Sequence, residues 1–541
     1  MTYDTLYING KIFTSSDDTP FVEAMAVKNG RIVWTGAAKD APTNEVAPES
    51  EAVAAEVVDL AGACVVPGFV DSHQHALEMA DAQNHLLVLP PNINSIEELI
   101  ENVAQVREEQ GPDLPVYGWG FEEGKLAELR TPNKYDLDRA VTDVPVVIFR
   151  SCVHVAAVNS KALELLNITK DTPDPQGGKI GRDENGEPNG ILYETAATAA
   201  KSLFPVPTAE ATAENLVTYG NLLSSQGVTT AAEMGSKISF DYRIAFKKAQ
   251  MLGFKTKIGF YYRWTLARED ENFVITAKDQ SPENQIRIAG VKLFGDGSIG
   301  GKTAWFHEPY YNVDTYGAPV CTEEDIDEAI AFAKKYKCQV AIHAIGNKAI
   351  DTALDHFCAE DSWMNEPVPT FRIEHAGTAT PEAVQRAVKS SVAFNGQPIF
   401  LYAEITSHVG SLGLERTQKC YPMKSWMEAG LQCCISTDAP ATSWVTPTDP
   451  MVSLKAATTR IAWNGTDCGQ DEIISLEDAI KLYTRESAKV LGFTNTGVLA
   501  PGYCADFVIL DRDIFQIPCA DLDQVKVKST FINGEKVYDA N

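Results

Sequence analysis

The chain has 541 residues, of which 44% are hydrophobic and 22% charged, and these proportions are typical of a folded, water-soluble protein rather than a disordered or fibrous one. Asp and Glu total 74 against 46 for Lys and Arg, so the formal net charge is −28 and the field of the protein repels a phosphate backbone. Nucleic acid is therefore excluded as an expected partner, and the length predicts a large domain with at least one smaller one.

The start of the chain and its cysteines bear on where the protein works. The first residues lack a basic stretch followed by an apolar segment, and no apolar run approaches the roughly 20 residues of a membrane span. The 11 cysteines contain no Cys-x-x-Cys pair, which favours free thiols in a reducing compartment. We therefore expect a cytoplasmic protein that has no membrane partner.

Two apolar, β-prone runs near the N-terminus, residues 6–13 and 24–34, each contain Asn-Gly, the strongest short-range signal for a hairpin. Residues 506–510 and 529–538 repeat this pattern near the C-terminus, with a second Ile-Asn-Gly turn. Matching turns at both ends predict one small β-sandwich domain that both termini build. Its predicted parts are residues 1–63 and 499–541.

Between the two ends, short apolar runs alternate with longer helical patterns, which is the order expected of βα units around a parallel sheet. We therefore predict an α/β fold in which residues 64–498 form a (β/α)8 TIM-type barrel. The active site of such a barrel lies at the carboxyl ends of its strands, so the polar residues there are the candidates. The clearest runs are residues 145–149, 290–294, 339–343, 371–375, 391–395 and 432–437.

Residues 78–210 form a segment that is long for one βα step. The segment contains loop-rich pieces with several Pro and Gly residues, at 171–178 and 182–190. We predict that it is an insertion in the early barrel that shapes the pocket.

Two histidines end the first buried strand of the predicted barrel. In extended backbone, residues i and i+2 point to the same side, so His73 and His75 can face one ion. Alone, this pair more often marks ordinary loop histidines. His343 and His375 each close another predicted strand, and Asp438 closes one more. Four histidines and a carboxylate at the strand ends of one barrel predict a shared metal site.

Imidazole and carboxylate ligands are typical of zinc, which keeps one position open for water and lowers the pKa of that water to about 7. The resulting hydroxide can attack a substrate at neutral pH. Asp438 is then placed to ligate the metal and to act as general base and acid, because it can take the proton of the water and give it to the departing nitrogen.

Lys292 lies between Val291 and Leu293 in a predicted strand, where an unpaired ammonium is costly to bury. An ion pair with Asp296 is one interpretation. The other is carbamylation of the neutral amine by carbon dioxide, which yields an anion that can bridge two metal ions. The residues alone leave these two interpretations about equal.

The candidate ligands and their surroundings resemble the binuclear amidohydrolase superfamily, and in particular its branch of N-substituted formamide deformylase-like, family 3 amidohydrolases. The ligands that carry the resemblance are His73, His75, Lys292, His343, His375 and Asp438. The matching stretches are residues 66–75, 291–300, 342–346, 372–376, 436–440 and 497–510. The likeness covers essentially the whole chain.

The resemblance implies a barrel with a split β-sandwich and a centre of one or two divalent ions, most often zinc. The implied ligands are His73, His75 and Asp438 for one ion, His343 and His375 for the other, and carbamylated Lys292 as the bridge. The resemblance also includes His154, which we count with Asp438 as catalytic because it is a candidate to contact substrate or to stabilise an oxyanion. Packing under the insertion explains His154 equally well. Glu194 fits the same pattern, but a solvated or helix-capping carboxylate is the favoured interpretation.

These inferences converge on a hydrolase of small-molecule amides, N-substituted formamides, carbamates or related C–N bonds other than peptide bonds. The alternative is a metal-assisted decarboxylase or isomerase that uses similar ligands. We also expect a homodimer, because large barrel proteins often form dimers; no residue pattern in this chain supports the expectation.

Overall fold

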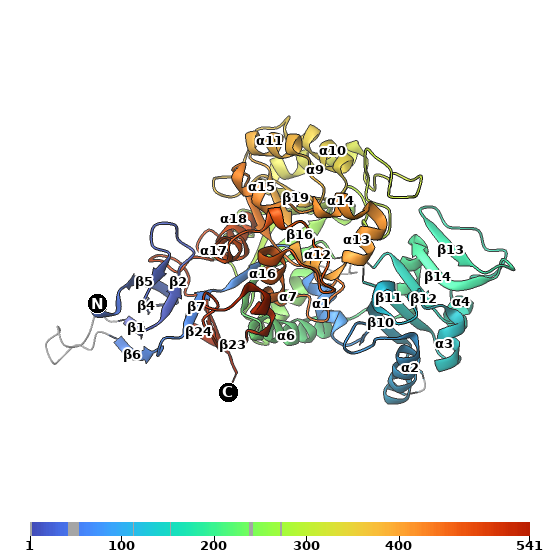
Figure 1. Ribbon diagram of the computed structural model, residues 1–541, viewed down its shortest axis with the longest axis horizontal. Helices are drawn as coiled ribbons and strands as arrows, with labels where there is room; N and C mark the ends of the chain where they lie inside the picture. Colours follow the sequence, from blue (N-terminus) through green and yellow to red (C-terminus); the bar gives the residue numbers. More distant parts are fainter. Residues whose placement is uncertain are drawn as a thin grey trace.

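The computed structural model describes residues 3–41, 54–111, 113–151, 153–236, 242–270 and 273–540. Figure 1 shows three neighbouring parts: a barrel in the centre, sheets near both termini at the left, and a further sheet at the right. The molecule has the mixed α/β architecture that the sequence predicts.

Eight strands form the barrel sheet, and every neighbouring pair in it is parallel. Most of their residues are buried, as expected for a parallel sheet that is covered on both faces. The predicted TIM-type barrel is therefore confirmed. Its strands are β8 (Phe69–Asp71), β15 (Val228–Met234), β16 (Lys257–Arg263), β17 (Ile286–Phe294), β18 (Gln339–Ala344), β19 (Phe371–His375), β20 (Ala393–Gly396) and β21 (Cys433–Ile435).

Helices connect the strands and cover the outside of the barrel (Figure 1). Helix α9 (Glu323–Tyr336) illustrates why they form: Thr322 and Asp325 cap its start reciprocally, and Lys337 ends it in a left-handed conformation. The other helices around the barrel are α6 (Ala209–Ser225), α7 (Tyr242–Met251), α8 (Trp264–Ala267), α10 (Asn347–Phe357), α11 (Pro381–Lys389), α12 (Pro398–Ala403), α13 (Ile405–Leu412), α14 (Leu414–Gln418), α15 (Met423–Glu428), α16 (Pro450–Thr459), α17 (Leu476–Lys481) and α18 (Ser487–Leu491).

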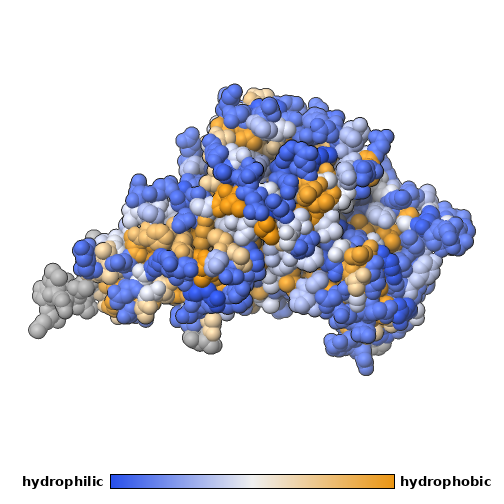
Figure 2. Space-filling view, viewed as in Figure 1, coloured by the Kyte–Doolittle hydropathy of each residue, from blue (hydrophilic) through white to orange (hydrophobic). Residues whose placement is uncertain are grey.

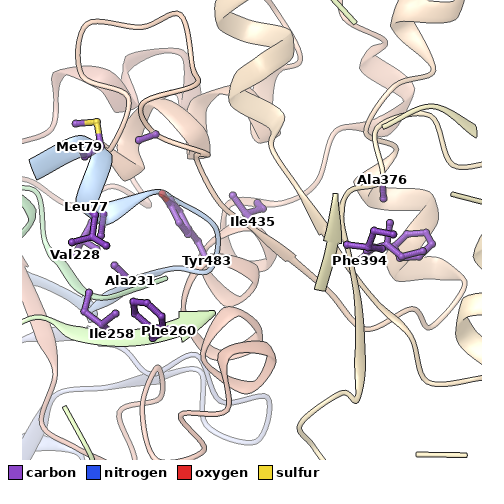
Figure 3. Packing of buried hydrophobic residues seen from close by; sticks show 14 of the residues in the cluster. Leu77, Met79, Val228, Ala231, Ile258, Phe260, Ala376, Phe394, Ile435 and Tyr483 are labelled. Carbon is purple, nitrogen blue, oxygen red and sulfur yellow. The ribbon is translucent and has the colours of Figure 1, made fainter. Parts of the chain in front are cut away.

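The main hydrophobic core lies between the barrel strands and these helices. Figure 3 shows Val228 and Ala231 of β15 near Ile258 and Phe260 of β16, with Leu77 close to them. All five side chains are almost fully buried. This packing makes the barrel a rigid support for the side chains at its strand ends.

Segments from both ends of the chain pair in one sheet, ordered β24-β23-β22-β7-β2-β3, which packs against a second sheet, ordered β5-β4-β1-β6. Tyr7 of one sheet and Phe507 of the other meet with ring centroids 5.1 Å apart. The strands are β1 (Tyr3–Ile8), β2 (Lys11–Phe13), β3 (Phe21–Val22), β4 (Ala24–Lys28), β5 (Arg31–Gly36), β6 (Ala54–Asp59), β7 (Cys64–Pro67), β22 (Phe507–Leu510), β23 (Val527–Ile532) and β24 (Glu535–Asp539). The division into domains at residues 63/64 and 498/499 stays a prediction.

The three Asn-Gly turns near the two ends of the chain do not all form hairpins. Asn29 and Asn533 have φ of 50° each and the glycines after them have φ of 73° and 74°, and these turns join β4 to β5 and β23 to β24. Asn9 instead joins β1 to β2, which lie in different sheets. The hairpin expected within residues 6–13 is therefore wrong, because the chain crosses between the sheets there.

The segment between β8 and β15 carries its own sheet, ordered β13-β14-β12-β11-β10-β9. Residues 145–149, which the pattern assigned to the barrel, belong to β11 of this sheet, because a buried parallel strand has the same local pattern in either sheet. The strands are β9 (Leu86–Leu87), β10 (Val116–Phe121), β11 (Val146–Arg150), β12 (Val155–Val158), β13 (Gly178–Arg182) and β14 (Pro188–Glu194), and the helices are α1 (Ala76–Ala82), α2 (Ile96–Gln110), α3 (Lys134–Ala140), α4 (Ser160–Leu165) and α5 (Thr195–Ala200).

Figure 2 shows a largely polar face, with apolar side chains gathered over the terminal sheets and in smaller patches on the barrel. Within the described ranges, no helix is both long and apolar enough to span a membrane. The ten described cysteines are all free thiols.

A buried ion pair joins the barrel to the terminal sheets, and breaking it is expected to destabilise the fold. Lys257 Nζ lies 2.5 Å from Asp506 Oδ2, and the two side chains are 7% and 0% exposed. Burial alone lowers the pKa of Lys257, but Asp506 outweighs it and raises that pKa. We expect Asp506→Asn to lower the free energy of unfolding by about 3–5 kcal/mol, because it leaves a buried ammonium without its counterion.

Urea and thermal unfolding measure this effect. The matched control is Glu535→Gln, which removes an ion pair to Lys255 whose side chains are 61% and 47% exposed. It should change stability by no more than about 0.5 kcal/mol. Equal effects of the two substitutions would contradict the expected role of the buried pair.

Candidate metal centre

The six predicted ligands all lie at the carboxyl end of the barrel. His73 and His75 follow β8, and Asp438 follows β21. Lys292, His343 and His375 lie in β17, β18 and β19, near or at their ends. Because parallel strands end at the same face of a barrel, segments more than 360 residues apart in sequence meet there.

Three of these residues form a tight group. Asp438 Oδ1 lies 3.2 Å from His73 Nε2 and 3.3 Å from His75 Nε2. Each of the three residues offers one ligand atom, and these three atoms all lie within 4.8 Å of one another. Asp438 Oδ1 is buried and accepts no hydrogen bond from the described residues. A buried, unpaired carboxylate oxygen facing two imidazoles suits a divalent cation, so the residues fit the metal that the resemblance implies.

The other three residues lie directly beside this group. Lys292 Nζ is 3.4 Å from His73 Nε2, and the ring of His375 has its centroid 4.8 Å from that of His73. The ring of His343 is 4.3 Å from that of His375, centroid to centroid. The structure therefore brings all six predicted ligands into one continuous cluster.

Hydrogen bonds orient three of the imidazoles. His73 Nδ1 lies 2.6 Å from the carboxylate of Glu374 and donates to it, which leaves Nε2 with its lone pair toward Asp438. His375 Nδ1 lies 2.9 Å from the side-chain oxygen of Gln397, and His343 Nε2 lies 3.0 Å from the carbonyl oxygen of Gly297. Each ring therefore keeps one nitrogen as an acceptor, which is the form that binds a metal.

Burial sets the ionisation of the cluster. It lowers the pKa of His343 far below its ordinary value and that of His375 to about 3, so both rings are neutral. Burial raises the pKa of Asp438, but His73 and His75 outweigh this effect and hold it well below the ordinary value. The neutral rings of His343 and His375 and the ionised carboxylate of Asp438 are in the protonation states that coordinate a metal. Burial lowers the pKa of His75, but Asp438 outweighs it and raises that pKa.

Lys292 is fully buried, and burial lowers the pKa of its amine to about 8. Asp296, its predicted ion-pair partner, accepts hydrogen bonds from the backbone amides of Trp305, Ile345 and Gly346, at 2.8, 3.0 and 2.8 Å. No ion pair joins Lys292 to Asp296 among the described residues. The ion-pair interpretation of Lys292 therefore has no contact to support it.

The ends of the first and last barrel strands are joined beside the cluster. Asp438 N donates to His73 O at 2.7 Å, and His75 N donates to Ala439 O at 2.8 Å. The carboxylate of Asp71 accepts a hydrogen bond of 3.1 Å from Thr437 N. These bonds fix Asp438 against the two histidines.

Two of the candidate ligands have strained backbones. The φ angles are 71° at His375 and 58° at Asp438, in the left-handed region that costs residues other than glycine on the order of 1–3 kcal/mol. Such conformations persist where the surrounding structure imposes them. Their presence at two candidate ligands is typical of a functional site.

Sequence reasoning missed the residues that orient the ligands. Glu374 is fully buried and also accepts hydrogen bonds from Arg372 at 3.0 Å and Asn395 at 2.9 Å. Its only sequence signal is a charged residue placed next to His375 in a buried strand that also contains Arg372. Gln397, which follows β20, has no comparable signal.

His154 lies in the insertion and not in the cluster of six. Its Nδ1 lies 2.7 Å from Glu194 Oε2, and the two side chains are 39% and 33% exposed. Glu194 precedes helix α5 but makes no capping hydrogen bond with its side chain. The favoured interpretation of Glu194 as a solvated or capping carboxylate is thus replaced by a pairing with His154.

The barrel and its strand-end cluster define a class of protein, the metal-dependent hydrolases built on this fold. The amidohydrolase family matches residues 56–538, and the chain belongs to that family.

Relatives of similar length support this assignment. The chain is 30% identical over 544 residues to YtcJ of Bacillus subtilis (strain 168), whose name describes it as an amidohydrolase, and the match covers 99% of each chain. It is 26% identical over 554 residues to the N-substituted formamide deformylase of Arthrobacter pascens, covering 99% of this chain and 98% of that protein. A crystal structure of a metal-dependent hydrolase from Pyrococcus horikoshii OT3 is similar with a TM-score of 0.76 and 29% identity, over 95% of this chain and 99% of that one.

Proposed function

We propose that the protein hydrolyses a C–N bond other than a peptide bond in a small molecule, with amides, N-substituted formamides and carbamates as the substrate classes. The observation that carries the proposal is the group of His73, His75 and Asp438, with an unpaired, buried Asp438 oxygen facing both imidazoles. The name of the Arthrobacter pascens relative supports the formamide class.

The proposed metal is zinc, as one or two ions. His73, His75 and Asp438 would hold one ion and His343 and His375 the other, with carbamylated Lys292 between them. A zinc ion bound there supplies a Lewis acid that makes water nucleophilic near neutral pH. Carbamylation needs a neutral amine, and burial favours that form because it lowers the pKa of Lys292 to about 8.

Asp438 carries the proton in the proposed reaction. Its ionised carboxylate takes a proton from the attacking water as the new C–O bond forms. It then gives this proton to the departing nitrogen as the C–N bond breaks, because an unprotonated amine is a poor leaving group. His154 is the proposed substrate contact from the insertion. The cytoplasmic location and the homodimer stay predictions.

Removal of metal tests the proposal directly. We expect the purified protein to contain zinc and to hydrolyse members of a panel of N-alkylformamides, N-acylamines and carbamates. Chelation should lower the rate by at least about 100-fold, because the chemistry that the metal supplies is lost, and added zinc should restore it. Undiminished activity in metal-free protein would refute the metal-dependent mechanism.

Isotopically labelled water separates hydrolysis from the alternative. Hydrolysis places one solvent oxygen in the acid product, whereas a decarboxylase or isomerase leaves solvent oxygen out of the product. No contact in the described residues favours the alternative over hydrolysis.

A further inference from the structure

One edge of the insertion sheet faces the mouth of the barrel. Strands β10 and β11 end at this edge, since they run parallel, and Ser151 just after β11 hydrogen-bonds through its hydroxyl to Ser443, five residues after Asp438. Strand β12 runs antiparallel to β11 and β14 antiparallel to β12, so β12 begins and β14 ends at the same edge. The residues at these two positions are His154 and Glu194.

A second contact links the insertion sheet to the segment that follows His75. Trp119 Nε1 of β10 donates a hydrogen bond of 3.1 Å to the carbonyl oxygen of Ala82, the last residue of helix α1, and this helix begins directly after His75. His154 and Glu194 therefore lie at the edge of a sheet that contacts the segments after His75 and after Asp438.

His154 and Glu194 are tied to each other twice. The side chains meet at 2.7 Å between Nδ1 and Oε2, and Glu194 N donates to His154 O, also at 2.7 Å. A carboxylate such as that of Glu194 can only accept, so Nδ1 carries the proton and Nε2 of the neutral ring is an acceptor. Because both side chains are about one third exposed, a substrate can reach the imidazole.

The backbone around the pair is strained. Val153 has φ of 62°, which is rare for a β-branched residue, and Glu194 has φ of 52° with ψ of −117°. Strained conformations are retained where they place a functional group. The strain thus indicates that the position of this imidazole serves a function and does not result from incidental packing.

We propose that His154, oriented by Glu194, is a specificity residue that accepts a hydrogen bond from the N–H of the substrate. The inference rests on the proposed function and narrows it: the enzyme selects N-monosubstituted amides and formamides over N,N-disubstituted ones, which have no N–H to donate. Glu194 is a positioning residue, because it fixes the proton on Nδ1 and so keeps Nε2 as the acceptor.

Kinetics with a matched pair of substrates test the selection. The probes are an N-alkylformamide and its N-methylated counterpart. The kcat/KM of the wild type is expected to be about tenfold higher for the N–H substrate, because one neutral hydrogen bond contributes a free energy that corresponds to about this factor. In His154→Ala and Glu194→Gln, kcat/KM is expected to fall about tenfold for the N–H substrate and to change little for the methylated one. The preference for the N–H substrate therefore disappears. The control is Glu164→Gln, an exposed carboxylate of the insertion that is 68% exposed and pairs with Lys161.

NMR of the ring nitrogens in isotope-labelled histidine tests the positioning without any substrate. His154 is assigned by its loss in His154→Ala. We expect the neutral ring of the wild type to be a single tautomer with the proton on Nδ1. In Glu194→Gln the amide can donate as well as accept, so a mixture of tautomers is expected. The same tautomer population in both proteins overturns the role of Glu194.

The remaining outcomes separate this inference from the function it rests on. Metal-dependent turnover of both substrates at equal rates by the wild type overturns the selection and leaves the hydrolase function intact. Equal losses on both substrates in His154→Ala also overturn it, because they indicate a structural role. If the metal-loaded wild type turns over none of the N-alkylformamides, N-acylamines and carbamates of the panel, both the proposed function and this selection are refuted.

Discussion

Asp438→Asn is expected to lower kcat for amide hydrolysis by about 10³-fold or more, while the protein stays folded. Asparagine has nearly the same shape, but it cannot take up the proton of the attacking water, and general acid–base catalysis alone contributes roughly 10²–10⁴-fold. The substitution also removes the negative charge that faces His73 and His75 at 3.2 and 3.3 Å, so weaker metal binding should add to the loss.

The measurement combines kcat at saturating substrate and zinc with metal content and a thermal unfolding curve. Asp361→Asn, in an exposed position away from the barrel mouth, is the matched control and should retain full activity. An Asp438→Asn protein with wild-type kcat would contradict the assignment of Asp438 as proton carrier. A variant that loses activity and also unfolds at a much lower temperature would indicate that the substitution disrupts the hydrogen bonds between the ends of β8 and β21 instead.

Lys292→Ala is expected to lower activity by at least about 100-fold and to reduce bound metal from two ions toward one. If the residue bridges two ions as a carbamate, its removal takes one ligand from each ion. Even mutation of a residue that only supports a ligand typically lowers metal affinity or activity by roughly 10–100-fold. A small carboxylic acid such as propionate fits the space that the alanine leaves and should restore part of the activity. Lys292→Arg, which cannot be carbamylated, should remain inactive.

Carbon dioxide provides the independent test of this prediction. Metal-free wild-type protein reconstituted with zinc in degassed buffer should regain activity slowly, and added bicarbonate should accelerate the recovery, because the neutral amine must first bond to carbon dioxide with loss of a proton. Recovery that does not depend on bicarbonate, together with full activity of Lys292→Arg, would show that an ordinary amine is sufficient at this position.

Local pattern predicted those parts of the fold and site that depend on neighbours in the chain. The alternation that places His73 and His75 on one side of a strand end is a property of extended backbone. The same holds for polar residues that close buried strands at His343 and His375. These ligands could be predicted because a parallel barrel collects all its strand ends at one face.

Local pattern failed where sheet membership decides the outcome. Residues 145–149 have the composition of a buried parallel strand, but they form β11 of the insertion sheet, which pairs parallel with β10 and antiparallel with β12. The Asn-Gly at Asn9 looks like a hairpin turn, yet it joins two sheets. A strand's neighbours depend on packing between distant segments, which propensity does not encode.

The sequence by itself therefore determined the class of fold, the order and chemical types of the candidate ligands, and the kind of chemistry they suit. Only the tertiary structure decided that Asp438 closes on His73 and His75 across the two ends of the barrel. It alone showed that Glu374 orients His73 and that the side chain of Glu194 pairs with His154 instead of capping helix α5. The reason is physical: a buried polar group must find a partner in space, and that partner can come from any part of the chain that folding brings within hydrogen-bond distance.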